Sequence, residues 1–140
     1  RLYRLCAERR LPVLIHCGPV GIELRIGRAL TQVRRYERAI VESPRTTFIL
    51  GHSGALQMEM ALALCQRFPN AFLELSSQSL SNVRRIIREA PPDRILFGTD
   101  WPWYHQAIGL AKVFLATEDR KEMRRTVLYD NAARLLGLEG

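Results

Sequence analysis

Four short apolar runs divide the chain, and each one lies between polar or turn-forming residues. Written out, they are PVLIHCG, TTFILGHSG, NAFLELSS and DRILFGTD, at residues 12–18, 46–54, 70–77 and 93–100. Continuous apolar runs of this length are typical of strands that are buried on both faces of a parallel sheet. We therefore predict four strands, each of which ends at small or polar residues.

Segments with helical spacing lie between these runs. Apolar residues recur every three or four positions over 26–40, 56–64 and 80–87, which predicts a helix in each segment. We expect further helices over 1–10, 105–116 and 118–136, with Thr117 as the N-cap of the last one. Strands and helices that alternate in this way predict an α/β fold with parallel strands joined by right-handed crossovers.

The length and composition of the chain indicate one globular domain. Its 140 residues are 47% hydrophobic, which is enough to bury a core. No apolar run approaches the roughly 18 residues that a membrane span needs, and the N-terminal segment lacks the apolar stretch of a secretory signal. We therefore expect a cytoplasmic protein with no membrane partner. The cysteines Cys6, Cys17 and Cys65 contain no C-x-x-C pair, which argues against a disulfide framework or a structural zinc site.

The net charge of +7 changes this picture little. Most of the positive charge is arginine, and it is spread along the segments with helical spacing, where such residues form solvated outer faces. The chain has no basic run interleaved with aromatic residues and no nucleic-acid motif. We therefore expect no nucleic-acid partner.

Candidate chemistry falls at the same place in every strand-and-helix unit. His16 ends the first strand, His52 the second, the pair Ser76 and Ser77 the third, and Asp100 the fourth. Carboxyl ends of parallel strands lie on one side of a sheet, so these side chains are expected to converge. Imidazole and carboxylate groups are ligands of zinc and similar metals. A hydrogen-bonded histidine and a capping aspartate are the ordinary alternatives, and both interpretations stay open on the pattern alone.

Four segments carry a resemblance to a known family. LPVLIHCG, FILGHSGA, DRILFGTDWP and NAARLLGL resemble, in this order and spacing, the second half of metal-dependent hydrolases of the amidohydrolase superfamily. The similarity is to the amidohydrolase-related group, which includes nonoxidative decarboxylases and lactone hydrolases. It implies a TIM (β/α)8 barrel of which residues 1–140 form the C-terminal half, with strands five to eight.

The resemblance also implies roles for the strand-end residues. His16 corresponds to a metal ligand, and Asp100 to an aspartate that contacts the metal and moves a proton. His52 corresponds to a histidine beside the metal-bound water or substrate. The implied cofactor is one divalent metal ion, with zinc as the first choice and manganese or iron as alternatives. The implied reaction on a small-molecule substrate is hydrolysis of a C–O or C–N bond, or nonoxidative decarboxylation of a carboxylic acid.

One departure from the family pattern limits what this chain does alone. The family has a His-x-His pair at its first strand, whereas the histidines here are His16, His52 and His105, none of them so spaced. We expect either a longer parent protein that supplies the pair, or a noncatalytic half-barrel that serves as an interaction or folding module. The chain by itself should bind metal weakly and, with open sheet edges, is open to homo-oligomerisation.

The residues around the fourth strand end are candidates for substrate contacts. Trp101 and Trp103 follow Asp100 and suit a planar or carboxylated ring, although both could instead pack the top of the barrel. Ser76, after the third strand, is a further substrate-binding candidate. His105 is expected at a solvated helix start.

Three other polar or reactive residues have structural explanations. Glu74 lies inside a buried strand and must meet an arginine or a polar barrel interior. Asn131 is polar on an apolar helix face and is interpreted as structural. Cys17 directly follows His16 and so points away from it, which argues against thiolate catalysis.

Overall fold

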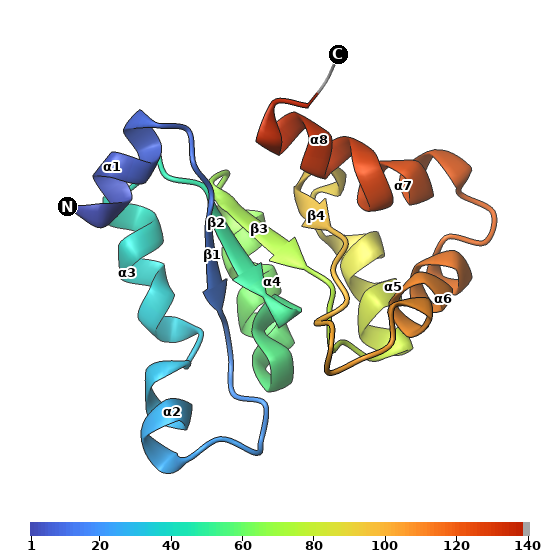
Figure 1. The fold of residues 1–140 in the computed structure, drawn as a ribbon, viewed down its shortest axis with the longest axis horizontal. Helices are drawn as coiled ribbons and strands as arrows, with labels where there is room; N and C mark the ends of the chain where they lie inside the picture. The colour runs from blue at the N-terminus through green and yellow to red at the C-terminus, as the bar shows by residue number, and fades with distance from the viewer. Residues whose placement is uncertain (139–140) are drawn as a thin grey trace.

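A four-stranded parallel sheet lies at the centre of the computed structural model, which describes residues 1–138 (Figure 1). The strands occur in the order β1-β2-β3-β4; the four parallel strands that the apolar runs predicted and the α/β class are confirmed. Ile15 pairs with Leu50, and Leu73 pairs with both Leu50 and Ile95, so the strand ends are aligned. Their bounds are β1 Val13–His16, β2 Phe48–Gly51, β3 Ala71–Glu74 and β4 Ile95–Leu96.

Helices follow each strand, with one break that the spacing did not predict, since the first helical segment is divided into α2 and α3. The last segment is helical without interruption from Lys121 to Leu136, where a π-helical turn joins α7 to α8. The helices are α1 Leu2–Glu8, α2 Arg25–Leu30, α3 Arg34–Glu42, α4 Met58–Arg67, α5 Leu80–Glu89, α6 Gln106–Ala116, α7 Lys121–Arg125 and α8 Asn131–Leu136. Shorter turns are η1 His52–Gln57, η2 Pro92–Arg94 and the π-helical η3 Thr126–Asp130. In the described chain, no helix is long and apolar enough to cross a membrane.

The expected N-cap at Thr117 is wrong, because this residue ends α6 and does not begin the next helix. Thr117 is fully buried, and its hydroxyl donates to the carbonyl of Val113 at 2.7 Å. The guanidinium of Arg124 donates to the Thr117 hydroxyl and carbonyl oxygens at 3.0 and 2.8 Å. Thr117 is therefore the C-cap of α6, and α7 begins later, at Lys121.

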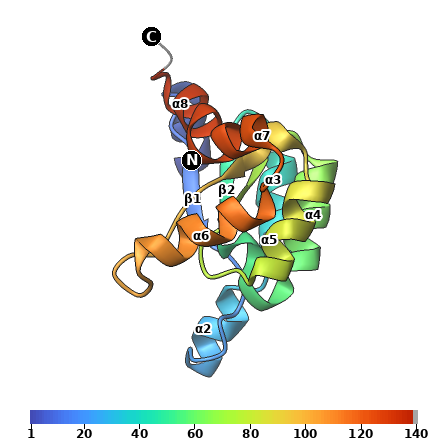
Figure 2. The same ribbon diagram turned by 90° about the vertical axis from the view of Figure 1, so that its right-hand side faces the viewer.

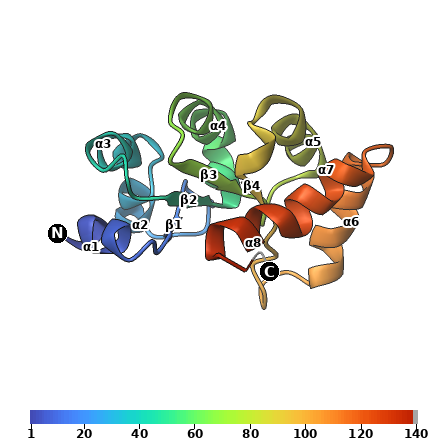
Figure 3. The same ribbon diagram turned by 90° about the horizontal axis from the view of Figure 1, so that it is seen from above.

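The helices leave one face of the sheet largely uncovered. α3, α4 and α5 lie side by side against one face (Figure 3), and Figure 2 shows α5, α6 and α7 together at the β4 end. Leu50 and Leu73 point into this helical layer and are fully buried. On the other face Leu14 is 65% exposed, and Ile49 and Phe72 are only half-buried. In a closed barrel this uncovered face would be the interior.

Asn131 fixes the C-terminal helices to the last strand. It is fully buried, and its side-chain amide donates to the carbonyls of Pro92 and Ile95 at 2.7 and 2.8 Å. Arg134 in turn donates to the Asn131 side-chain oxygen at 3.0 Å. These bonds satisfy a polar group on an otherwise apolar helix face. The structural interpretation of Asn131 is confirmed.

Because one face of the sheet is uncovered, we expect the protein to self-associate. A single charged residue on this face should reduce the association. We expect Leu14→Lys to shift the protein toward the monomer without loss of helicity, because the side chain is already 65% exposed. The measurement is molar mass by light scattering over a range of concentrations. Val41→Lys, at a residue 52% exposed on the outer helix α3, is the matched control and should leave the association unchanged. Equal association in both variants would contradict the assignment of this face.

Candidate active site

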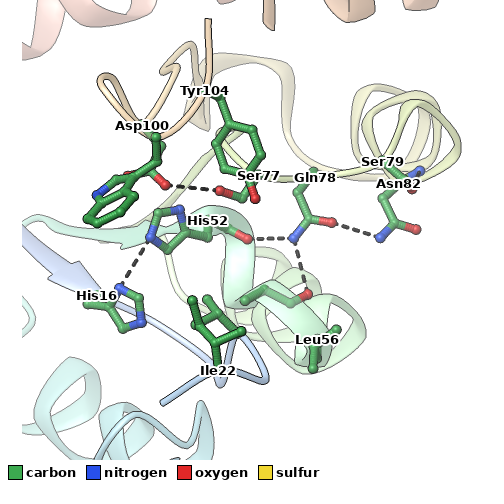
Figure 4. A pocket seen from close by; sticks show the side chains of 13 residues that line it. His16, Ile22, His52, Leu56, Ser77, Gln78, Ser79, Asn82, Asp100 and Tyr104 are labelled. Atoms are coloured by element: carbon green, nitrogen blue, oxygen red, sulfur yellow. Dashed lines mark hydrogen bonds between the residues drawn. The ribbon is translucent and has the colours of Figure 1, made fainter. Parts of the chain in front are cut away.

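Three strand ends and one following loop meet in a pocket of about 600 Å³. His16, His52, Ser77 and Asp100 line it, as predicted from the common edge of a parallel sheet (Figure 4). Each comes from the carboxyl end of a different strand or from the turn directly after it. The remaining lining residues are Val20, Ile22, Ala55, Leu56, Gln78, Ser79, Asn82, Trp103 and Tyr104.

The backbone is left-handed at a pocket residue after each of the strands β2, β3 and β4. His52, Ser77 and Asp100 have φ values of 55°, 60° and 59°. Residues other than glycine adopt this conformation at a cost, and such residues cluster at functional sites. His52 directly follows β2, whereas Ser77 and Asp100 lie in the loops after β3, which ends at Glu74, and β4, which ends at Leu96. Asp100 lies in the loop after β4 and lines the pocket, where its carboxylate accepts from the Ser77 hydroxyl, and the N-cap of the next helix is His105 instead.

Two glycines let the loops after β1 and β2 approach each other. A Cβ atom on Gly18 would lie 1.8 Å from the carbonyl oxygen of Gly54, and both glycines have a φ of +83°. A side chain at Gly18 would therefore push the two loops apart. Because Gly18 and Gly54 each follow a pocket histidine by two residues, their close approach brings His16 and His52 together.

The two histidines form a direct pair. Nδ1 of His16 lies 3.2 Å from Nε2 of His52, and the two rings are edge-to-face with centroids 4.9 Å apart. Burial is the largest cause that lowers the pKa of His16, followed by the neighbouring His52. The carboxylates of Asp100 and Glu23 act on this pKa in the opposite direction. A lowered pKa keeps the imidazole neutral near pH 7, which is the form that binds metal ions.

Glu74 lies behind His52 and meets a polar interior instead of an arginine. Its carboxylate accepts hydrogen bonds from the His52 backbone N–H at 2.9 Å, the Ser76 N–H at 2.6 Å and the Ser76 hydroxyl at 2.7 Å. Gly98 packs against the same group, since a Cβ atom there would lie 1.9 Å from Oε1. Of the two alternatives for Glu74, the polar barrel interior is therefore the one observed.

The substrate-contact candidates differ in where they lie. Trp103 lines the pocket although it is 81% exposed, and Trp101, 64% exposed, is outside the lining. Ser76 is buried beneath His52, where Nδ1 of His52 is 2.8 Å from its hydroxyl oxygen. The neighbouring Ser77 lines the pocket instead, and its hydroxyl donates to Asp100 at 3.2 Å.

Gln78 and Asn82 are pocket residues that the sequence analysis missed. The side-chain amide of Gln78 donates to the carbonyls of His52 and Ala55 at 2.5 and 3.1 Å, and so holds the left-handed turn after β2. Asn82 donates to the Gln78 side-chain oxygen at 2.7 Å. The polar run SSQS after the third strand was the available signal, because polar residues at a strand end lie near the pocket.

Two expectations about residues outside the pocket are confirmed. Cys17 is fully buried, and burial raises the pKa of its thiol to about 12, so it carries no thiolate at neutral pH. His105 is exposed at the start of α6, where its Nδ1 accepts from the backbone N–H of Ala107 at 3.2 Å. It is a helix N-cap.

The donor atoms of the pocket fit part of a metal site. His16 and Asp100 supply an imidazole nitrogen and a carboxylate oxygen to the same pocket, and zinc accepts both kinds of ligand. No group of three or more His, Cys, Asp or Glu side chains placed to hold a metal occurs within residues 1–138. The residues that the structure describes therefore offer only part of a ligand set.

Comparison with known proteins points to one family. The protein-family model described as Amidohydrolase matches residues 1–138. No curated protein matches the chain.

Solved structures share the fold. An uncharacterised TIM-barrel protein from Bordetella bronchiseptica matches with a TM-score of 0.76 and 21% identity, over 97% of this chain and 49% of its own. The 2,6-dihydroxybenzoate decarboxylase from Rhizobium matches with a TM-score of 0.70 and 22% identity, over 96% of this chain and 54% of its own. A dihydroxybenzoic acid decarboxylase from Polaromonas, with bound manganese and the inhibitor 2-nitroresorcinol, has a TM-score of 0.70 and 21% identity, over 99% and 53%. The chain thus spans about half the length of these proteins, as a partial barrel.

The close approach of Gly18 and Gly54 predicts that a methyl group added at Gly18 will lower the free energy of unfolding. Gly18→Ala should destabilise the fold by about 2–5 kcal/mol, because a left-handed alanine costs roughly 1–2 kcal/mol and the clash with Gly54 adds about 1–3 kcal/mol. Gly137→Ala is the control, since Gly137 also has a positive φ (68°) but no atom lies within 4 Å of its Cβ position. Urea unfolding followed by circular dichroism measures both. Similar losses in the two variants would rule out the proposed steric contact.

Proposed function

This chain belongs to the amidohydrolase family, and on that premise we propose that it forms the C-terminal, proton-handling half of a metal-dependent TIM-barrel enzyme. The observation that carries the proposal is the convergence of His16, His52 and Asp100 from three strand ends on one pocket. The family contains metal-dependent hydrolases and decarboxylases. A pocket with two imidazoles and a carboxylate suits either reaction.

His16 and Asp100 are the residues that would hold a divalent metal ion, together with donors from the other half of the barrel. The ion would act as a Lewis acid toward a water or substrate oxygen. Zinc is our first choice because imidazole is among its preferred ligands. Manganese remains an alternative, since it is bound in the Polaromonas decarboxylase, and iron accepts the same ligands.

The proton steps are assigned to His52 and Asp100. His52 lies within hydrogen-bond distance of His16 and borders the open part of the pocket, so it can exchange a proton with a bound water or substrate. The Ser77 hydroxyl donates to Oδ2 of Asp100, which orients this carboxylate while its other oxygen stays available. General acid–base groups placed in this way contribute about 10²- to 10⁴-fold to a rate.

The pocket walls favour a small planar substrate. Ile22, Leu56, Trp103 and Tyr104 add apolar and aromatic surface to the pocket lining. Such a lining with a few polar groups is typical of small-molecule sites. We therefore propose a ring-bearing carboxylic acid or its lactone or amide, in line with the dihydroxybenzoic acid decarboxylases among the matched structures. In this assignment Trp103 and Ser77 contact the substrate, and Trp101 lies at the rim.

The test replaces each proposed group in the protein that contains the complete barrel. We expect His16→Ala to lose metal and activity together, because a ligand is removed. His52→Ala should keep near-normal metal content and lower the rate by about 10²- to 10⁴-fold. Asp100→Asn keeps the shape but removes charge and basicity, so turnover should collapse. The measurements are metal content by elemental analysis and the rate of carbon dioxide release from 2,6-dihydroxybenzoate or of lactone hydrolysis.

His105→Ala is the matched control, since this histidine is an exposed helix N-cap and should leave both readouts unchanged. Near-normal turnover in Asp100→Asn would overturn the catalytic assignment. Normal metal content in His16→Ala would remove His16 from the ligand set. If the wild-type protein itself shows neither metal nor turnover, the half-barrel is better explained as a noncatalytic folding or interaction module.

A further inference from the structure

A chain of hydrogen bonds runs from the pocket into the interior through His52. Nδ1 of His52 lies 2.8 Å from the hydroxyl oxygen of Ser76, and that hydroxyl lies 2.7 Å from Oε2 of Glu74. Ser76 is only 5% exposed and Glu74 is half-buried, so both groups lie beneath the pocket floor. The same carboxylate holds the backbone N–H of His52 at 2.9 Å. One acidic group thus contacts both the main chain and, through Ser76, the ring of His52.

The chemistry of these groups fixes the direction of the chain. An ionised carboxylate only accepts hydrogen bonds, so the single Ser76 hydroxyl proton is committed to Glu74. The Ser76 oxygen must then accept from His52, which requires the proton to be on Nδ1. Nε2 is left with its lone pair, and it is Nε2 that lies 3.2 Å from His16 at the pocket surface.

We propose that Glu74 and Ser76 are positioning residues that hold His52 in its Nδ1–H tautomer, with the Nε2 lone pair facing the pocket. In water, free histidine favours the opposite tautomer, with the proton on Nε2. A partner that fixes one ring nitrogen decides which nitrogen is available to the substrate. Glu74 acts through Ser76 and has no direct contact with the pocket.

Packing around Glu74 supports this role. Gly98 leaves no room for the carboxylate to move toward β4, because a Cβ atom at Gly98 would lie 1.9 Å from Oε1. The Ser76 backbone N–H donates to that same oxygen at 2.6 Å. With each carboxylate oxygen engaged and one side closed, the acceptor that orients Ser76 stays in a fixed position.

The proposal rests on the proposed function only for its catalytic consequence. If His52 exchanges a proton in the reaction, it must present an unprotonated nitrogen to the pocket, and the Glu74–Ser76 pair provides this before substrate arrives. Loss of such a supporting partner typically costs about 10- to 100-fold in activity. The tautomer itself can be measured with no substrate or metal.

The test reads the His52 ring by nitrogen NMR. In metal-free, ¹⁵N-labelled wild-type protein at a pH where the ring is neutral, we expect two-bond correlations to show a protonated Nδ1 and an unprotonated Nε2. Ser76→Ala removes the acceptor, so the Nε2–H form should become the major one. Glu74→Gln replaces one acceptor oxygen by an amide donor and should give a mixture with less Nδ1–H than wild type.

Ser77→Ala is the matched control for this readout, since the Ser77 hydroxyl donates to Asp100, whereas Nδ1 of His52 is bonded to Ser76. It should leave the His52 tautomer as in wild type. A wild-type ring with its proton on Nε2 would overturn the proposal even if Ser76→Ala failed to fold, and so would a Ser76→Ala ring that kept Nδ1–H.

Failure of this inference is distinguishable from failure of the proposed function. Suppose that wild type has the Nε2–H tautomer but the His16, His52 and Asp100 variants lose turnover as expected. This result would reject only the positioning role of Glu74 and Ser76. The expected tautomer in a protein without turnover would keep the positioning role and reject the enzyme. In an active protein, Ser76→Ala should lower kcat and leave metal content and KM nearly unchanged.

Discussion

The carboxylate of Glu74 is the interaction on which the site depends. It joins the end of β3 to the end of β2 by accepting the backbone N–H of His52, and it also engages both polar groups of Ser76. A charge inside a sheet is costly unless its hydrogen bonds are made, and these three bonds satisfy it. Because β1 is in register with β2, a fixed position for His52 also determines where His16 meets it. Glu74, which lies beneath the pocket, thus fixes the positions of both pocket histidines.

Much of this arrangement was predictable from sequence. Short apolar runs gave the four parallel strands, and their common edge predicted that His16, His52 and Asp100 would line one pocket. Both predictions rest on local periodicity and on the geometry of parallel sheets, which depend little on side-chain detail. Asn131 was interpretable for a similar reason, because a polar residue on an apolar helix face needs a buried partner.

Other features depend on contacts that no local pattern records. Thr117 looked like an N-cap, but its hydroxyl donates to the carbonyl of Val113, four residues earlier, and accepts from Arg124. The role of Gln78 could not be predicted, because its side chain bonds to two backbone carbonyls in the turn after β2, which is distant in sequence. Ser76 and Ser77 are adjacent, and the contacts of Ser76 with His52 and Glu74 distinguish it from Ser77, which lines the pocket.

The left-handed strand ends carry a consequence for sequence variation. At His52, Ser77 and Asp100 the backbone penalises β-branched and bulky apolar residues before any chemistry is considered, and it tolerates Asn, Asp, His and Gly best. Of these residue types, Asp and His also bind metal ions and transfer protons. The backbone conformation therefore restricts substitutions at these three positions largely to residue types that can also take part in catalysis. A descendant protein that lost the original reaction would still have polar side chains around this pocket, and these side chains could serve a different reaction.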